Sequence, residues 1–534
     1  MCDFIFQYTS ARLWVRVIKW ISILSIIVSL LLYIYCTRID GGRIFIVSYY
    51  SSIINEKHNS GNDINIGFSL FQFEQEKLRE KQLKYEYNLT GIILHWKRLH
   101  SVRKTISYFL QTDLFHEIIV WNNNPQINLT ILKLDIKNYS TENIRIINSK
   151  DNLKDEAKYR ACIAAKTRAC LYVDDDWNIS HYTKSLIASY RSDPNLLHSI
   201  TEPFTYYTNL IWSYFDDTID LHTGFSWIGC GSVFSREHAQ RHLQLLDKYL
   251  SNNSSTYNFF QLSDVFFSIW LNDIPTQMIA DIRYQTNSAA EQSVSFSSMS
   301  NFLTLQYQSS LAAIRILEQF LRSNQSNTSQ INFPRQQIRR FPYYIKSPSL
   351  TDDFIFYSNI IPYDLHNVTF NITKDFERGT RRNLPQGSHV RYFTYLSPLR
   401  AVDRNLKTCW HSTRMLRSDD FYAIDFLHIQ TNISFLVYVN HSLELQKNLV
   451  ISISFNGLWW IPYRSQNGIY TKTSKDTGQV QLHMILFSSD RFNPGFQSFR
   501  YIKFQTLNQS HDRFQVCELQ IISKRNITHL LYDF

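Results

Sequence analysis

The chain is 534 residues long and carries a formal net charge of +10, with 15% aromatic but only 19% charged residues. This length predicts at least two domains, and the composition is typical of a folded chain, not a disordered one. The positive charge is not gathered in basic runs, and no glycine-rich RNA-binding motif accompanies it. Lysines scattered in this way usually make a solvated surface, which argues against a nucleic-acid-binding protein.

The N-terminal region contains an uncharged stretch, rich in isoleucine and leucine, from Trp20 to Cys36. It is just long enough to cross a bilayer, and the excess of basic residues before it favours a cytoplasmic N-terminus. A cleaved signal peptide is the alternative, but its apolar region is normally shorter and ends at small residues. We therefore expect a cytoplasmic tail over 1–19, a transmembrane signal anchor over 20–36 and a stem over 37–86.

The rest of the chain is then lumenal, in the Golgi or the ER, and its glycosylation triplets agree with that side of the membrane. Asn-x-Ser/Thr triplets begin at Asn88, Asn128, Asn138, Asn252, Asn324, Asn327, Asn367, Asn371, Asn432, Asn440, Asn508 and Asn526. Five lumenal cysteines are an odd number, so at least one is free or pairs between chains. Cys409 with Cys517 is a candidate bridge within the last domain.

Strand-like and helix-like segments alternate from Tyr87 onward. Strands are predicted over 91–94, 117–121, 144–147 and 171–173, and helices over 101–110 and 155–169. This alternation predicts an α/β domain over 87–322 with a mostly parallel sheet and helices on both faces. Ligands of such sheets bind beyond the carboxyl ends of the strands. Asn122, Asn123 and the triplet Asp174-Asp175-Asp176 follow two of these ends and are expected to share one crevice.

The acidic triplet Asp174-Asp175-Asp176 follows a buried strand, where unpaired carboxylates are costly to bury. A Mn²⁺ or Mg²⁺ ion is a natural partner because it prefers carboxylate oxygens and also holds diphosphates. Alternate residues of an extended segment face the same way, so Asp174 and Asp176 are expected to reach one ion together. The alternative is an acidic turn or helix N-terminus without a metal, since Asp caps helices well.

The order of these motifs resembles that of glycosyltransferases of the GT-A fold. Within this fold it is most similar to the exostosin-like family 64, and next to the broader family 2. The resemblance is carried by the Ile-Val-Trp-Asn-Asn segment, the Tyr-Val-Asp-Asp-Asp segment and the glycine-containing run from Phe225 to Phe234. Ser263-Asp264-Val265 is similar to the family's later acidic position, although the family's usual cysteine is missing there. The similarity spans roughly 87–285.

The resemblance implies that the domain binds a UDP-sugar through a metal ion that bridges the diphosphate. The metal ligands would be Asp176 and Asp174, with Asp174 alternatively a ribose contact and Asp175 in a supporting role toward the nucleotide or sugar. The remaining donor contacts implied are Asn122 and Asn123 at the base or ribose, Lys158 or Arg160 at the phosphate, and Gly229 and Gly231 near the sugar.

Asp264 would lie near the acceptor hydroxyl or the anomeric carbon. In an inverting enzyme it would be the general base, and in a retaining enzyme it would only orient or stabilise. Its alternative role is a helix N-cap before the apolar run that follows it. Gly229 and Gly231 have an alternative role in a tight turn, and Trp227 is either core or a platform for a sugar ring.

The last third of the chain changes character. An amphipathic helix is predicted over 303–321, a polar linker over 323–350, and short strands with turns between them over 351–534, which predict an antiparallel β-sandwich. Landmarks from Asp403 to Leu519 resemble a discoidin or galactose-binding-like jelly roll, whose implied role is glycan or acceptor binding. A purely structural role is the alternative. Trp410, Trp459 and Trp460 are expected in the core and not on a sugar-binding surface.

Two classes of function follow. The first is a type II membrane glycosyltransferase that is metal-dependent through Asp174 and Asp176 and moves a sugar, with an N-acetylhexosamine as one candidate, to a glycan or glycoprotein. The second is a non-catalytic, membrane-anchored glycan-binding protein on a degenerate transferase fold. The intact acidic triplet favours the enzyme, since a binding protein has no use for stacked carboxylates.

Overall fold

The computed structural model describes residues 63–522 with several gaps, and residues 71–534 form one compact unit. The gaps are residues 137–138, 204, 206–213, 217, 251–261, 285–301, 325–343, 361–391, 393, 432, 441–444, 446–447, 459, 463–468, 475–481 and 489–497. The predicted signal anchor over 20–36 and most of the predicted linker lie outside the described residues. In the part of the chain that the structure describes, no helix combines the length and apolar character that crossing a bilayer requires.

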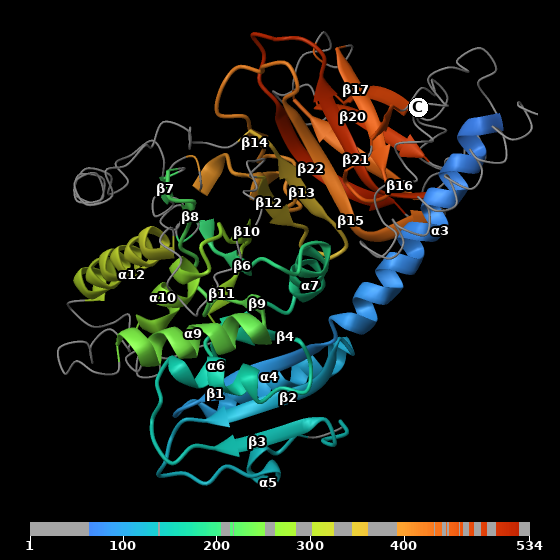
Figure 1. Cartoon of the computed structure of the whole chain (residues 1–534). Coiled ribbons are helices and arrows are strands. Elements are labelled where there is room, and N and C mark those ends of the chain that lie inside the picture. Colours follow the sequence, from blue (N-terminus) through green and yellow to red (C-terminus); the bar gives the residue numbers. More distant parts are fainter. Residues whose placement is uncertain are drawn as a thin grey trace, which may run out of the picture. The chain divides into compact units, whose positions relative to one another are not determined.

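The first half of the described chain is an α/β arrangement around a mostly parallel sheet (Figure 1). Its strands are β1 (Leu89–His95), β2 (Phe115–Asn122), β3 (Ile144–Asn148), β4 (Ala169–Val173), β6 (His198–Thr201), β9 (Ser232–Ser235) and β10 (Thr276–Ile279). Strands β3, β2, β1 and β4 are parallel neighbours, as the sequence predicts. Strand β9 is antiparallel to both β4 and β6, and it joins the four parallel strands β3, β2, β1 and β4 to the parallel strands β6 and β10.

Helices cover both faces of this sheet, which explains why its strands are apolar on both sides. The helices are α4 (Leu99–Thr112), α5 (Ile131–Leu134), α6 (Glu156–Ile163), α7 (Thr183–Ser192), α9 (Arg236–Tyr249), α10 (Ser263–Trp270) and α12 (Phe302–Asn324). The apolar stripe of α4, formed by Val102, Ile106 and Phe109, packs with residues of β1, β2 and α7 in one buried cluster. Helices α6, α9, α10 and α12 pack in a second cluster on the other face.

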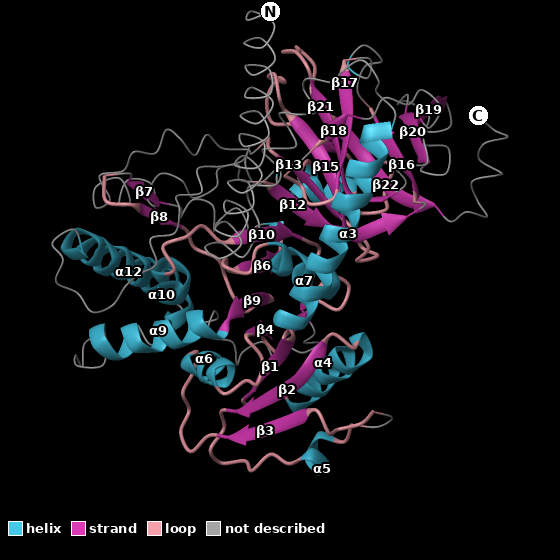
Figure 2. Cartoon of the chain, turned by 45° about the vertical axis from the view of Figure 1, so that its right-hand side comes forward, coloured by secondary structure: helices cyan, strands magenta, loops and turns pink. Residues whose placement is uncertain are grey.

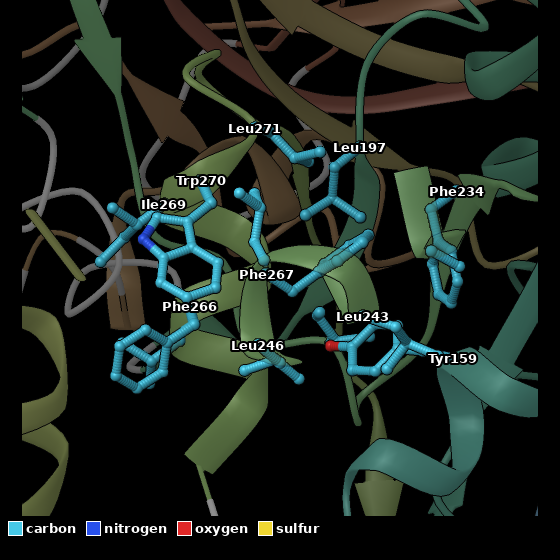
Figure 3. Close-up of a cluster of buried hydrophobic side chains, with 14 of the residues drawn as sticks. Tyr159, Leu197, Phe234, Leu243, Leu246, Phe266, Phe267, Ile269, Trp270 and Leu271 are labelled. Atoms are coloured by element: carbon cyan, nitrogen blue, oxygen red, sulfur yellow. The ribbon is translucent and has the colours of Figure 1, made fainter. Parts of the chain in front are cut away.

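Aromatic side chains dominate the second cluster near the acidic triplet. Figure 3 shows Tyr159 of α6, Phe234 of β9 and Phe267 of α10 among its buried side chains. The ring centroids of Tyr159 and Phe267 are 4.7 Å apart, and those of Phe234 and Phe267 are 5.1 Å apart. These three rings connect helix α10, which carries Asp264, to the central sheet.

The last part of the chain forms an antiparallel β-sandwich (Figure 2). Its strands are β12 (Ile345–Pro348), β13 (Ile355–Ser358), β14 (Trp410–His411), β15 (Phe421–Thr431), β16 (Ser434–Val439), β17 (Leu449–Ser454), β18 (Ile461–Pro462), β19 (Ile469–Ser474), β20 (Leu482–Ser488), β21 (Ser498–Thr506) and β22 (Gln515–Ile522), with a 3₁₀ turn at Pro398–Ala401. One sheet runs β14-β22-β16-β20-β19, and the other includes β18-β17-β21-β15-β13.

Alternation along the strands fills the interior of the sandwich. Tyr422, Ile424 and Phe426 of β15 lie in its buried core, together with Trp410, which is fully buried. The prediction that Trp410 is core is confirmed, Trp460 is half-buried, and position 459 lies outside the described residues. A disulfide joins Cys409 to Cys517, which confirms the candidate bridge.

The α/β sheet and one sheet of the sandwich are continuous, which the sequence analysis did not foresee. Strand β12 lies inside the segment predicted as a linker, pairs in parallel with β10 at Met278 and Lys346, and pairs antiparallel with β13. The resulting sheet has thirteen strands among the described residues. Two smaller pairs complete the strands, β5 (Trp177–Asn178) with β11 (Arg283–Tyr284) and β7 (Tyr214–Asp216) with β8 (Leu221–Thr223).

Two predicted segments differ from the structure. The predicted helix over 155–169 ends at Ile163, because the chain must turn to enter β4 at Ala169 opposite Leu89 of β1. A disulfide between Cys162 and Cys170 ties the end of α6 to β4, and Cys230 is the one free cysteine in the described part. Part of the predicted stem is not irregular but forms α3 (Asp63–Glu86), which lacks the apolar periodicity that reveals a helix from sequence.

Three buried histidines each oppose the folded state at acidic pH. His198, His238 and His242 are at most 8% exposed, and burial lowers their pKa values, that of His238 to about 3. The folded state therefore holds them neutral, whereas the unfolded chain binds protons below pH 6.5, so the contribution of these histidines to stability is lost as the pH falls through that value. We expect each histidine to lower the free energy of unfolding by about 1 kcal/mol between pH 7 and pH 5.5.

Chemical denaturation at the two pH values measures this loss. His242→Phe is the matched variant, because neither ring nitrogen of His242 has a hydrogen-bond partner in the described part of the chain and its ring packs on Tyr159 and Phe267. Between pH 7 and pH 5.5, the free energy of unfolding of this variant is expected to change by about 1 kcal/mol less in the destabilising direction than that of the wild type, because one buried histidine is removed. Equal losses in the two proteins would contradict the assignment of His242 as a buried neutral group.

Candidate functional site

The three carboxylates after β4 lie at the carboxyl end of the parallel strands, beside the loop that follows β1. They form a turn and not an extended segment, since the backbone N–H of Trp177 donates to the carbonyl of Asp174. We call residues 174–176 the acidic turn. The expected alternation, with Asp174 and Asp176 on one side, therefore does not hold: Asp175 and Asp176 instead share one cation.

That cation is Arg98, which lies just before helix α4. Its Nη2 is 2.5 Å from Asp175 Oδ1, its Nε is 3.2 Å from Asp175 Oδ2, and its Nη1 is 3.0 Å from Asp176 Oδ2. Burial raises the pKa of Asp175 to about 7, an effect that Arg98 opposes. Burial also raises the pKa of Asp176, and the negative charge of the nearby Asp174 carboxylate raises it further. The guanidinium therefore offsets part of the cost of gathering these carboxylates.

Asp174 has hydrogen-bond partners of its own within the acidic turn. Its backbone N–H donates to the carbonyl of Gly229 at 2.8 Å, and its Oδ1 accepts a hydrogen bond from the hydroxyl of Tyr172. A Cβ atom at Gly229 would lie 2.0 Å from Asp174 Oδ2. Only glycine at position 229 lets this carboxylate lie against the backbone.

Gly231, two residues further on, has a different role. Its φ angle is +132°, a conformation that L side chains rarely adopt, and a Cβ there would press on Ile179 and Ile200. Gly231 therefore shapes the turn into β9, and the alternative prediction of a tight turn describes it well. Trp227 is half-buried beside this segment and packs against residues of both apolar clusters.

The acidic turn has features that suit a divalent cation. In the part of the chain that the structure describes, the buried Asp176 Oδ1 has no hydrogen-bond partner, which leaves one carboxylate oxygen unused. Among the described residues, no three His, Cys, Asp or Glu side chains are placed to hold an ion by themselves. Mg²⁺-type sites commonly use one or two carboxylates and complete their coordination with substrate phosphates and water. Asp174 and Asp176 fit a site of that kind, although not a closed protein cage.

Lys158 and Asp264 form a buried ion pair behind the acidic turn. The Lys158 Nζ is 2.7 Å from Asp264 Oδ1 and 2.8 Å from Oδ2, and the Tyr159 hydroxyl donates to Oδ1 at 2.9 Å. Burial opposes the charge of Lys158, but the carboxylates of Asp155 and Asp264 outweigh it and raise the lysine pKa. The side chains of Lys158 and Asp264 are 1% and 3% exposed, so neither faces solvent.

The catalytic role predicted for Asp264 therefore finds no direct support in this geometry. Asp264 is not the N-cap of α10 either, because the N-cap is Leu262 and Asp264 lies in the first turn. Both of its oxygens are used by Lys158 and Tyr159. What Asp264 does in the structure is hold Lys158 beside the strand that carries the acidic turn.

The two asparagines predicted to contact the nucleotide bond to other protein groups in the structure. The Asn122 side chain is fully buried and bonds to His95, Asn148 and the backbone. Asn123 donates to the carbonyl of Lys154 and accepts from the N–H of Leu153. These amides brace the loops after β2 and β3.

Arg160 is 45% exposed and pairs with Glu156 within its own helix. Of the two cations predicted to hold phosphate, Arg160 thus lies at the surface and Lys158 is buried with Asp264.

The sequence analysis missed Arg98 and Tyr172. A signal for Arg98 was present, since it follows the predicted strand 91–94, whose carboxyl end lies beside that of the strand before the acidic turn. Tyr172 was identified only as part of an apolar strand. Its polar end was overlooked because a tyrosine within an apolar run is typical of core.

A scan against protein-family models finds no family that matches this sequence, and a search of curated proteins finds no match either. Among solved structures, the chain is similar to chitosan-binding module 2 of a chitosanase/glucanase from Paenibacillus sp. IK-5, in complex with chitotriose. The identity is 14%, the match covers 23% of this chain and 85% of that one, and the TM-score is 0.17.

Two carbohydrate-binding modules from Clostridium perfringens are similar to the same degree. They are CBM32-1 of a family 31 glycoside hydrolase (16% identity, 23% of this chain and 82% of that one, TM-score 0.16) and CpGH89CBM32-5 in complex with GalNAc-beta-1,3-galactose (15% identity, 24% and 84%, TM-score 0.16). These matches are to discoidin-like modules, the class that the C-terminal landmarks resemble. With TM-scores this low, the sandwich is defined by its own strand pairing.

Proposed function

We propose that the chain is a metal-dependent glycosyltransferase of the GT-A type that moves a sugar from a UDP-sugar to a glycan or glycoprotein acceptor. The observation that carries the proposal is the acidic turn. Three carboxylates gather at the carboxyl end of β4, and Asp176 keeps a buried oxygen that has no hydrogen-bond partner among the described residues. The exostosin-like order of the sequence motifs supports the same reading, and the lumenal side of the Golgi or ER is the compartment we propose.

Asp174 and Asp176 would hold the Mn²⁺ or Mg²⁺ ion, which when bound supplies a Lewis acid for the charge on the departing nucleotide diphosphate. Other residues of the chain fix the positions of these carboxylates. Gly229 lets the Asp174 carboxylate lie against the backbone, and Arg98 orients Asp175 and Asp176. Carboxylates that are fixed in advance need little rearrangement when the donor binds, which is the main requirement of such a site.

For the C-terminal sandwich we propose a role in binding the glycan acceptor, on the basis of its discoidin-like sequence landmarks. Asp264, enclosed by Lys158 and Tyr159, is assigned to positioning and not to proton transfer. The acceptor base is left unassigned.

Calorimetric titration of the full-length chain in detergent with a panel of UDP-sugars, with and without Mn²⁺, tests the proposal. We expect one UDP-sugar to bind in the presence of Mn²⁺ and its binding to be lost with EDTA. If a folded sample binds no nucleotide sugar, the transferase proposal is wrong. A membrane-anchored glycan-binding protein then becomes the better description, and a glycan array is the measurement that follows.

Gly229→Ala is expected to weaken both Mn²⁺ binding and turnover by about tenfold or more, because the new Cβ must displace the Asp174 carboxylate. Gly231→Ala is the contrasting variant, since it strains a positive φ and crowds Ile179 and Ile200. That variant is expected to lose stability but keep its Mn²⁺ affinity. Mn²⁺ titration and chemical denaturation of both variants give the comparison, and equal Mn²⁺ affinities for Gly229→Ala and wild type would contradict it.

A further inference from the structure

Tyr172 connects the acidic turn to the buried interior of the α/β domain. It is fully buried in β4, two residues before Asp174, and side chains two apart in a strand face the same side. Its hydroxyl donates a hydrogen bond to Asp174 Oδ1. This bond lies on the protein side of the carboxylate and is separate from the contacts of Arg98, which reach only Asp175 and Asp176.

Asp174 is thereby held at three points. The Tyr172 hydroxyl engages Oδ1, the backbone of Gly229 lies against Oδ2, and the Asp174 N–H donates to the Gly229 carbonyl. By contrast, Asp176 Oδ2 accepts a hydrogen bond from Arg98, and its buried Oδ1 has no hydrogen-bond partner within the described ranges. The Asp174 carboxylate is therefore fixed by its contacts, whereas Asp176 keeps one oxygen that the described residues do not engage.

The ring of Tyr172 is in turn contacted by a buried lysine. The Lys158 Nζ lies 4.6 Å from the centroid of this ring, at a distance suited to a cation–π contact. Lys158 is fixed in turn by its two short contacts to Asp264 of α10. A continuous chain of contacts therefore runs from α10 through α6 and β4 to the acidic turn.

We propose that Tyr172 is a positioning residue that holds Asp174 in place as a preorganised ligand for the divalent cation, backed by Lys158 and Asp264. The inference rests on the proposed function and deepens it. Residues that hydrogen-bond a metal ligand fix its orientation, and their loss typically weakens metal affinity by about 10–100-fold. Tyr172 acts in this way without touching the substrate.

The test is Tyr172→Phe in the full-length chain, which keeps the buried ring and removes only the hydroxyl. Tyr108→Phe is the matched control, because the Tyr108 hydroxyl of α4 is also buried but has no hydrogen-bond partner among the residues that the structure describes. Mn²⁺ is titrated by calorimetry in the presence of UDP, and the spin-resonance spectrum of bound Mn²⁺ is recorded. Thermal melting in EDTA shows whether each variant is folded.

We expect Tyr172→Phe to bind Mn²⁺ about tenfold more weakly and to broaden the Mn²⁺ spectrum, with a melting temperature near that of the wild type. Tyr108→Phe is expected to match the wild type in both readouts. Equal Mn²⁺ affinity in Tyr172→Phe and wild type overturns this inference and leaves the transferase proposal standing. If the wild type binds neither Mn²⁺ nor UDP, the proposed function fails and this inference fails with it.

Discussion

Asp176→Asn is expected to abolish metal-dependent turnover, with a loss of about a thousandfold or more. Asparagine keeps the shape of the side chain and can still meet Arg98, but it removes the negative charge and the unused oxygen of Asp176. A Lewis acid at a departing diphosphate supplies several kcal/mol of stabilisation, and each 1.4 kcal/mol corresponds to about tenfold in rate. Turnover of the UDP-sugar identified by titration is the measurement, together with Mn²⁺ affinity.

Asp113→Asn is the control for this substitution. Asp113 is exposed at the end of α4 and has a φ of 47°, a conformation that asparagine tolerates. It is expected to leave turnover unchanged. Asp174→Asn should behave like Asp176→Asn, and the double variant should remain folded in chemical denaturation. Turnover that survives in a folded double variant would show that the assignment of the metal ligands is wrong.

Lys158→Met is expected to have the largest effect on stability. It removes the only cation that contacts Asp264 among the described residues, and it leaves this carboxylate buried and uncompensated at 2% exposure. Breaking a buried ion pair from one side typically costs about 3–5 kcal/mol. A loss of that size in the free energy of unfolding, measured by urea denaturation, is the expected result.

Two further variants separate the charge effect from the loss of packing. Lys158→Met combined with Asp264→Asn removes the unpaired Asp264 charge and leaves only the partly exposed Asp155 without its contact to Lys158, so it is expected to recover at least half of the lost stability. Arg160→Met, in the same helix, removes an exposed cation paired with Glu156 and should change stability by less than about 1 kcal/mol. If the double variant is no more stable than Lys158→Met, burial of an unpaired carboxylate is not the cause.

The α/β half could be predicted from sequence because its signals are local. The apolar runs of β1, β2 and β4 and the stripe of α4 each determine an element, and the alternation of elements implies a parallel sheet. The acidic triplet was recognisable for a similar reason, since carboxylates are out of place after an apolar strand. The boundaries were less predictable: α6 ends six residues early because β4 has to begin opposite Leu89.

The contacts within the site were not predictable, because they join residues far apart in the sequence. Arg98 and Asp175 are 77 positions apart, and Lys158 and Asp264 are 106 apart. No periodicity or motif specifies which cation will meet which carboxylate. The resemblance placed Lys158 at the phosphate and Asp264 at the acceptor, whereas the structure pairs them with each other.

The amino-acid sequence by itself indicated the strand–helix alternation from β1 to β4, the strand-rich sandwich, a candidate bridge between Cys409 and Cys517, and the acidic triplet at the end of a strand. Tertiary structure alone decided that the two sheets join through β12, that the triplet turns so that Asp175 and Asp176 share Arg98, and that Tyr172 and Gly229 hold Asp174. The physical reason is the range of the forces involved. Apolar periodicity reflects the geometry of residues that are close together along the chain, so it can be read from the sequence. The pairing of buried charges depends instead on which strands and helices become neighbours after folding.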